Sequence, residues 1–104
     1  MTNQARSIFE EIEEVAKRAE EANSEAQFRL IRRVPRYSQE TIRTEIARAL
    51  GTIAGAHFRT LELYAQFRQL EPPLPLPSRL VYYKKVRDCL ARFKKMSGEL
   101  NSLT

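Results

Sequence analysis

The chain holds few of the residues that carry most enzyme and metal chemistry. It has no tryptophan, and only one cysteine, one histidine and one aspartate, at Cys89, His57 and Asp88. These three side chains cannot complete a conventional four-ligand zinc site within one chain, and the CxxC and HExxH spacings are absent. A lone cysteine also excludes an intrachain disulfide. The sequence therefore predicts no bound metal, no cofactor and no enzymatic activity.

Long apolar runs are also missing. No stretch approaches the roughly 20 apolar residues that span a bilayer, and the first nine residues contain no apolar signal-peptide core. We therefore expect a soluble intracellular protein, cytoplasmic by default, that makes no membrane contact. With 104 residues, of which 42% are hydrophobic and 30% charged, the chain suits one small helical domain.

Proline occurs at two places, and these divide the chain. Because proline cannot continue a helix and disfavours helix in the residue before it, breaks are expected in RVPRYS (33–38) and EPPLPLPS (71–78). Ser38 and Ser78 are suitable N-caps for the segments that follow. We predict helices over about 3–33, 39–70 and 79–103, with 71–78 as a stiff proline connector, all within a single domain spanning 1–104.

Each predicted helix carries an apolar seam with alternating three- and four-residue steps, which is typical of helices that pack side by side. If the proline segment reverses the chain, Phe67 faces Tyr82 across a long antiparallel hairpin. The predicted fold is all-α: this hairpin plus an N-terminal helix, as a three-helix bundle or an intertwined helical dimer. The seams are Ile8, Ile12, Val15, Ala19, Ala22 and Ala26; Ile46, Leu50, Ile53, His57, Thr60, Tyr64 and Phe67; and Tyr82, Val86, Cys89, Phe93, Met96, Leu100 and Leu103.

Two of the three glycines lie in the middle of the second predicted helix, where each costs about 1 kcal/mol relative to alanine. Ala47, Gly51 and Gly55 recur every four residues and form a ridge of small residues. We predict that this ridge permits close approach of another helix, and that the alanines of the first seam are its partner. A hinge is the alternative. The predicted helix-packing interface is Ala19, Ala22, Ala26, Ala47, Gly51, Gly55 and His57.

His57 belongs to the apolar seam of the second helix and faces the region of Cys89 and Phe93. A cysteine beside a histidine can act as a nucleophile with its base, because an imidazolium lowers the pKa of a thiol. A helical seam offers no substrate cleft, however. We interpret the pair as a buried thiol beside a core histidine, with a role for His57 in setting register or oligomeric state as a further alternative.

The net charge of +5 is unevenly distributed. The first 26 residues carry seven glutamates against three basic residues, whereas the later chain is strongly basic. The basic residues can complement the acidic first helix within a bundle, which is the interpretation we favour, or bind phosphates or an acidic protein. They are Arg79, Lys84, Lys85, Arg87, Arg92, Lys94 and Lys95 in the third helix, and Arg29, Arg32, Arg33, Arg36 and Arg43 around the first break.

The apolar seams are the most specific feature of the sequence. They favour a non-enzymatic assembly or adaptor subunit that acts through coiled-coil-like helix–helix contacts, in a homo-oligomer or a heteromeric protein complex. The alternative is a small basic nucleic-acid-binding protein that uses the outer face of the third helix and the arginines near the first break. Salt separates the two, because phosphate binding weakens steeply with added salt and an apolar helical interface persists.

Overall fold

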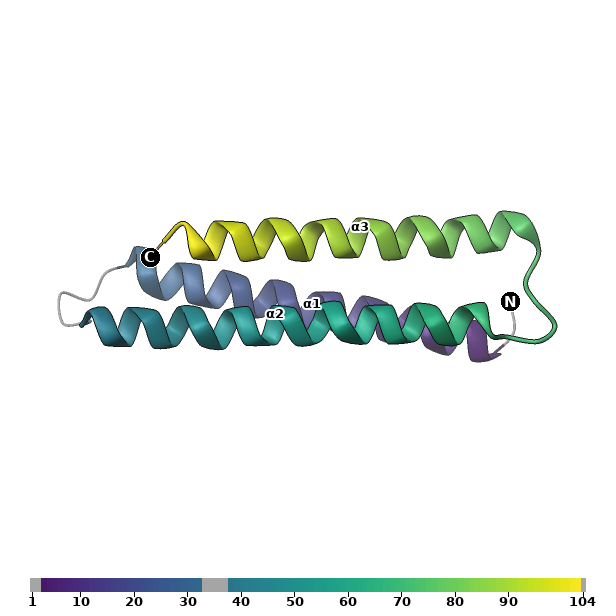
Figure 1. The fold of residues 1–104 in the computed structure, drawn as a ribbon, viewed down its shortest axis with the longest axis horizontal. Helices are drawn as coiled ribbons and strands as arrows, with labels where there is room; N and C mark the ends of the chain where they lie inside the picture. The colour runs from purple at the N-terminus through teal and green to yellow at the C-terminus, as the bar shows by residue number, and fades with distance from the viewer. Residues whose placement is uncertain (1–2, 33–37, 104) are drawn as a thin grey trace.

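The computed structural model describes residues 3–32 and 38–103, which form three long helices and contain no strand. Helix α1 spans Asn3–Ile31, α2 spans Gln39–Arg68 and α3 spans Leu76–Asn101. Helix α2 runs antiparallel to both of its neighbours, so that α1 and α3 point the same way (Figure 1). The result is an all-α three-helix bundle in the shape of a rod, 57 × 19 × 17 Å. The predicted fold class is confirmed.

The start of α2 follows the predicted capping chemistry. The backbone N–H of Thr41 donates to the Ser38 hydroxyl oxygen at 3.2 Å, which satisfies one of the free amides of the first turn. Glu40 adds a negative charge beside the positive end of the helix dipole. Of the first predicted break, residues 33–37 lie outside the described residues, and these include Arg33 and Arg36.

The start of α3 differs from the prediction. The helix begins at Leu76, three residues earlier than expected, so Ser78 lies inside the first turn and is not its cap. Proline is tolerated there because the first amides of a helix have no intrahelical partner, and Pro77 therefore does not delay the helix. The proline connector is accordingly shorter than 71–78. The other helix ends fall within two residues of the predicted ones.

The seams of α1 and α3 form the core largely as predicted. In α1, Ala19 and Ala26 are buried and Ala22 is half-buried. In α3 the prediction fails only at Leu103, which is 41% exposed because it lies beyond the end of the helix. The buried seam residues are Ile8, Ile12, Val15, Ala19 and Ala26 in α1, and Tyr82, Val86, Cys89, Phe93, Met96 and Leu100 in α3.

The core seam of α2 is displaced from the predicted one at every second position. Leu50 and Tyr64 are half-buried and His57 is exposed, whereas the residues just before them in sequence are buried. The reason is that α2 packs against two helices at once, so its buried arc is centred between them. The core seam of α2, called its inner face below, is Ile46, Ala49, Ile53, Ala56, Thr60, Leu63 and Phe67.

Tyr82 joins all three helices near the end of the rod where α2 leads into α3. Its ring stacks on Phe67 with centroids 4.0 Å apart, which confirms the predicted hairpin pairing. Phe9 of α1 meets the same ring edge-on at 5.2 Å, and the Tyr82 hydroxyl donates to the Ala5 carbonyl oxygen. Burial raises the pKa of Tyr82, with Arg6 opposing that shift, so the neutral donor form is favoured.

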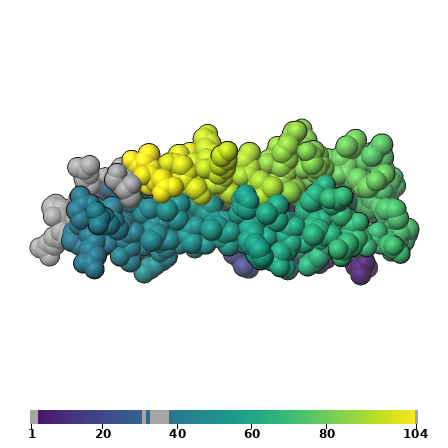
Figure 2. Space-filling model, viewed as in Figure 1, coloured from purple at the N-terminus to yellow at the C-terminus, as the bar shows by residue number. Residues whose placement is uncertain are grey.

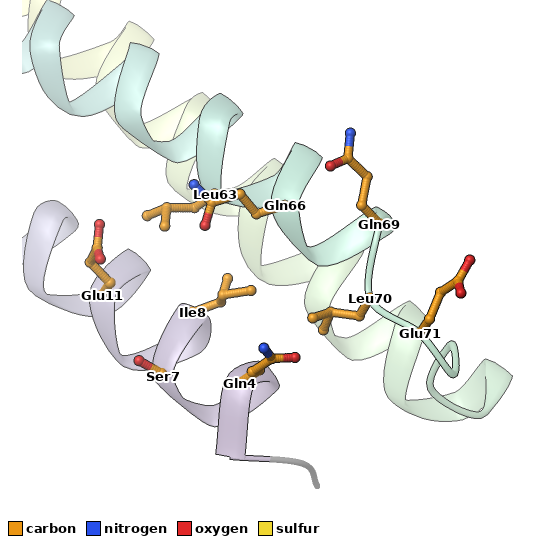
Figure 3. Close-up of a pocket in the computed structure, with 9 residues that line it drawn as sticks. All are labelled: Gln4, Ser7, Ile8, Glu11, Leu63, Gln66, Gln69, Leu70 and Glu71. Atoms are coloured by element: carbon orange, nitrogen blue, oxygen red, sulfur yellow. The ribbon is translucent and has the colours of Figure 1, made fainter.

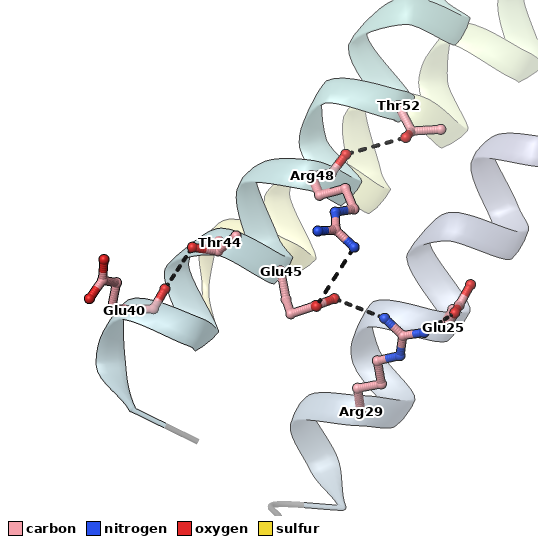
Figure 4. A network of polar contacts seen from close by, with 7 residues as sticks. All are labelled: Glu25, Arg29, Glu40, Thr44, Glu45, Arg48 and Thr52. Atoms are coloured by element: carbon pink, nitrogen blue, oxygen red, sulfur yellow. Dashed lines mark hydrogen bonds and ion pairs between the residues drawn. The ribbon is translucent and has the colours of Figure 1, made fainter. Parts of the chain in front are cut away.

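Ion pairs join α1 to its neighbours along the edges of the core. Arg59 of α2 donates to Glu11 at 2.6 Å, and Arg29 of α1 donates to Glu45 at 3.1 Å. Figure 4 shows the second pair as part of a network at the boundary of α1 and α2. Side chains on both sides of these pairs remain partly exposed, so each pair contributes at most about 1 kcal/mol.

Candidate helix-docking surface

The solvent side of α2 carries a second apolar stripe, whose members are all exposed. Its members are spaced by alternating steps of four and three residues, as in a coiled-coil seam, and none is charged or polar. Phe58 and Leu61 are 64% and 44% exposed. We call this set the outer stripe: Ala47, Gly51, Ala54, Phe58, Leu61 and Ala65, all exposed.

Beside the outer stripe lies an open groove between α2 and α3, with a volume of about 550 Å³. Its lining is almost entirely apolar, with Ala54 shared with the outer stripe and Lys94 at its rim. Figure 2 shows the face on which α2 and α3 lie side by side and α1 is largely hidden. The groove is lined by Ile53, Ala54, His57, Leu90, Ala91, Phe93, Lys94 and Ser97.

The predicted packing of the glycine ridge against the alanines of α1 is wrong. A Cβ atom added to Gly51 or Gly55 would meet no atom within 4 Å, so both glycines border open space. Ala47 is exposed as well. The small residues of α2 that do pack inward are Ala49 and Ala56, because they lie on the inner face. Of the predicted interface, Ala19 and Ala26 are buried, Ala22 is half-buried, and Ala47, Gly51, Gly55 and His57 are exposed.

His57 and Cys89 do not form a pair. The imidazole is exposed beside the groove, with its ring 6.5 Å from that of Phe93, whereas the Cys89 thiol is buried. Burial raises the pKa of the Cys89 thiol, and this favours the unreactive neutral form over the thiolate. The expected buried thiol is present, but His57 is not a core residue.

The predicted charge complementarity between α1 and α3 gives one ion pair between these helices in the described residues, from Arg92 to Glu20. Two other cations lie over aromatic rings: Lys85 over Phe9, and Arg87 over Tyr83. The basic residues of α3 that form no ion pair in the described part of the chain are Arg79, Lys84, Lys85, Arg87, Lys94 and Lys95.

Of the arginines near the first break, the structure describes Arg29, Arg32 and Arg43. Arg29 is held by Glu25 and Glu45, and Arg32 lies over the ring of Phe28 at 4.5 Å. Arg43 is exposed on α2. Two of these three described arginines are therefore already engaged within the chain, whereas several cations of α3 form no ion pair in the described residues.

A second hollow, of about 470 Å³, lies between the start of α1 and the end of α2 (Figure 3). The amide side chains of Gln4 and Gln66 and the carboxylate of Glu11 line this hollow, and the Glu11 carboxylate is already bound to Arg59. In residues 3–32 and 38–103, no cluster of His, Cys, Asp or Glu could hold a metal ion. In that same part of the chain, no helix combines the length and the apolarity that crossing a membrane requires.

Comparison with protein families, curated proteins and solved structures finds no match to this chain. Its surfaces are therefore the guide to its function. The prediction missed the larger members of the outer stripe, Phe58 and Leu61, together with Leu90 in the groove. The signal is present in the sequence, since the step pattern continues from Ala47 and Gly51 through Phe58 to Ala65, but the prediction gives each helix a single seam.

Proposed function

We propose that the protein is a non-enzymatic assembly subunit that binds another helix along the outer stripe of α2. The observation that carries this proposal is a coiled-coil-spaced, wholly apolar stripe whose members are all exposed. It extends over about 27 Å of helix, at 1.5 Å per residue. Single exposed apolar residues are normal on soluble proteins, but a continuous seam at this spacing is typical of helix–helix interfaces.

Burial of the two large side chains would supply most of the binding energy. Removing a Phe or Leu side chain from water is worth about 1.5 to 3 kcal/mol when burial is complete. Phe58 and Leu61 lie one turn apart in the C-terminal half of the stripe, where they can insert between the residues of a facing helix. The apolar groove beside Ala54 extends the same contact toward α3.

A photo-crosslinking experiment in the cells that make the protein tests this proposal. We would replace Phe58 with p-benzoylphenylalanine, irradiate, and identify the adduct by mass spectrometry of its crosslinked peptide. The matched control is the same replacement at Phe28, which is 57% exposed on α1 and lies outside the outer stripe. We expect one defined protein adduct from position 58 and none from position 28. The absence of any adduct at 58 would overturn the proposed function.

A second candidate function rests on the cations of α3. Lys84, Lys94 and Lys95 are exposed and form no ion pair in the described residues, so they are available to phosphates. Under this alternative, a labelled nucleic acid duplex binds at low salt, and its affinity falls at least tenfold between 50 and 200 mM salt. Replacing the three lysines with glutamine would abolish that binding. If no binding occurs at low salt, this alternative is wrong.

A further inference from the structure

We infer that the helix received by the outer stripe is α2 of a second copy of this chain, antiparallel to the first about a two-fold axis near Gly55. This inference rests on the proposed function, because it names the occupant of the same surface. Two independent properties of the stripe support it: the order of its large and small residues, and the charges beside it.

The two halves of the outer stripe differ in size. Ala47, Gly51 and Ala54 make up the N-terminal half, whereas the C-terminal half holds the two large residues, Phe58 and Leu61, followed by Ala65. An antiparallel coiled-coil register centred near residue 56 places Gly51 against the partner's Leu61. The same register places Ala54 against the partner's Phe58. Each large side chain thus meets a small residue, and the open space above Gly51 is filled.

A parallel pairing would not give this fit. It would set Phe58 against the partner's Phe58 and Gly51 against the partner's Gly51 at the same level. The bulky pair would hold the helices apart while the glycine layer left a void, and a void forfeits the packing contacts on both sides. The size order therefore favours the antiparallel arrangement.

Charge complementarity selects the same register. Arg48 and Glu62 flank the outer stripe on one side and lie equally far before and after Gly55 in sequence. In the antiparallel register, Arg48 faces the partner's Glu62, and the symmetric pair forms on the other side of the axis. In a parallel pair, the two-fold axis runs along the helices, so Arg48 and Glu62 of one copy lie across the seam from those of the partner and cannot pair with them.

Inside the chain these two charges have only weak partners. The Arg48 Nη1 atom is 4.0 Å from Glu45 Oε1, at the edge of the network in Figure 4, and the Arg48 side chain is 69% exposed. Glu62 Oε1 is 3.7 Å from Arg59, which Glu11 already binds at 2.6 Å. Both side chains can therefore turn toward a partner at little cost. A stripe whose halves complement each other in size and charge suits self-association, because a surface for an unrelated helix needs no such internal match.

Light scattering of the purified chain tests whether the outer stripe binds a second copy. We expect twice the monomer mass of 12.1 kDa at micromolar concentration. The two-fold axis places each substitution in the interface twice, once from each copy. Phe58→Asp should therefore weaken association about 100-fold or more and yield a monomer. The matched control, Phe28→Asp, should remain a dimer. Circular dichroism should show both variants fully helical, since both side chains are exposed.

Charge exchange tests the register. Arg48→Glu and Glu62→Arg should each weaken the dimer about tenfold, because each places two like-charged pairs across the axis. The variant that carries both changes should recover the parent affinity. Gly51→Leu should abolish the dimer and leave the helix content unchanged, since the partner's Leu61 would occupy the same space. If the double variant does not recover, the antiparallel register is wrong.

The two proposals fail separately. A monomeric parent chain combined with a crosslink from position 58 to a different protein would overturn the second-copy inference and keep the proposed function. A monomeric parent chain with no crosslink would overturn both. A dimer that Phe58→Asp leaves intact would overturn the second-copy inference on this surface.

Discussion

The inner face and the outer stripe of α2 have the same pattern of three- and four-residue steps, but the inner face is buried against two helices and the outer stripe faces solvent. On the inner face, Ile53 and Leu63 are each 1% exposed, whereas on the outer face Phe58 is 64% exposed. The inner face has more bulky aliphatic residues than the outer stripe, whose first two members are an alanine and a glycine. A heptad step pattern identifies a surface that can pack against a helix, and side-chain size decides which of two such surfaces becomes the core.

The largest expected effect contrasts two phenylalanines of α2. Phe67→Ala should lower the free energy of unfolding by about 3 to 5 kcal/mol, because it removes a buried ring stacked on Tyr82 and leaves a cavity. Phe58→Ala should change it by less than about 0.5 kcal/mol. Urea unfolding at submicromolar chain concentration measures both without a contribution from association. Equal losses at the two positions would abolish the distinction between the faces.

An intermediate effect is expected at the point where three helices meet on the inner side. Tyr82→Phe keeps the stacked ring and removes the hydroxyl that donates to the Ala5 carbonyl. The free energy of unfolding should fall by about 1 kcal/mol, the usual net value of such a bond. The control is Tyr83→Phe. Tyr83 is the next residue in sequence and is 49% exposed, so removal of its hydroxyl should change the free energy of unfolding little. An equal loss in both variants would mean that the hydrogen bond to α1 is not the cause.

Glycine replacements should raise stability where the helix surface is open. Gly51→Ala and Gly98→Ala should each stabilise the monomer by up to about 1 kcal/mol, since neither new methyl group meets an atom within 4 Å. Only Gly51→Ala should also weaken dimerisation, because Gly98 lies on α3 away from the outer stripe. Thermal melts at low concentration, followed by light scattering at high concentration, separate the two effects. A lower melting temperature for Gly51→Ala at low concentration would show a contact above that glycine within one chain.

The smallest effect is expected at the border between the two faces. Glu11→Gln removes the charge partner of Arg59, whose side chain is 40% exposed. The free energy of unfolding should fall by less than about 1 kcal/mol, and the loss should shrink in high salt. Chemical unfolding at two salt concentrations tests this, with Glu14→Gln as the control for an exposed pair within α1. A loss that salt leaves unchanged would point to packing instead of charge.

The helices and two of the three core seams follow from local chemistry, because proline and a serine cap mark the breaks and the predicted seams of α1 and α3 hold most of the buried residues of those helices. The seam of α2 could not be predicted in the same way. Leu50 and Tyr64 are both larger than Ala49, and each directly follows a buried residue in sequence. Only the placement of the two neighbouring helices decides which of these adjacent positions is buried. The outer stripe, in contrast, is visible in the sequence as a second set of apolar steps, and the prediction overlooks it because it gives α2 a single seam.

The elongated shape of the bundle has a consequence for how the protein migrates. Its radius of gyration is 16.7 Å, whereas a compact domain of this length has about 13 Å. A rod meets more frictional resistance than a sphere of equal mass, so even a single copy diffuses slowly and leaves a gel-filtration column early. An early peak alone would therefore suggest a dimer where only one chain is present.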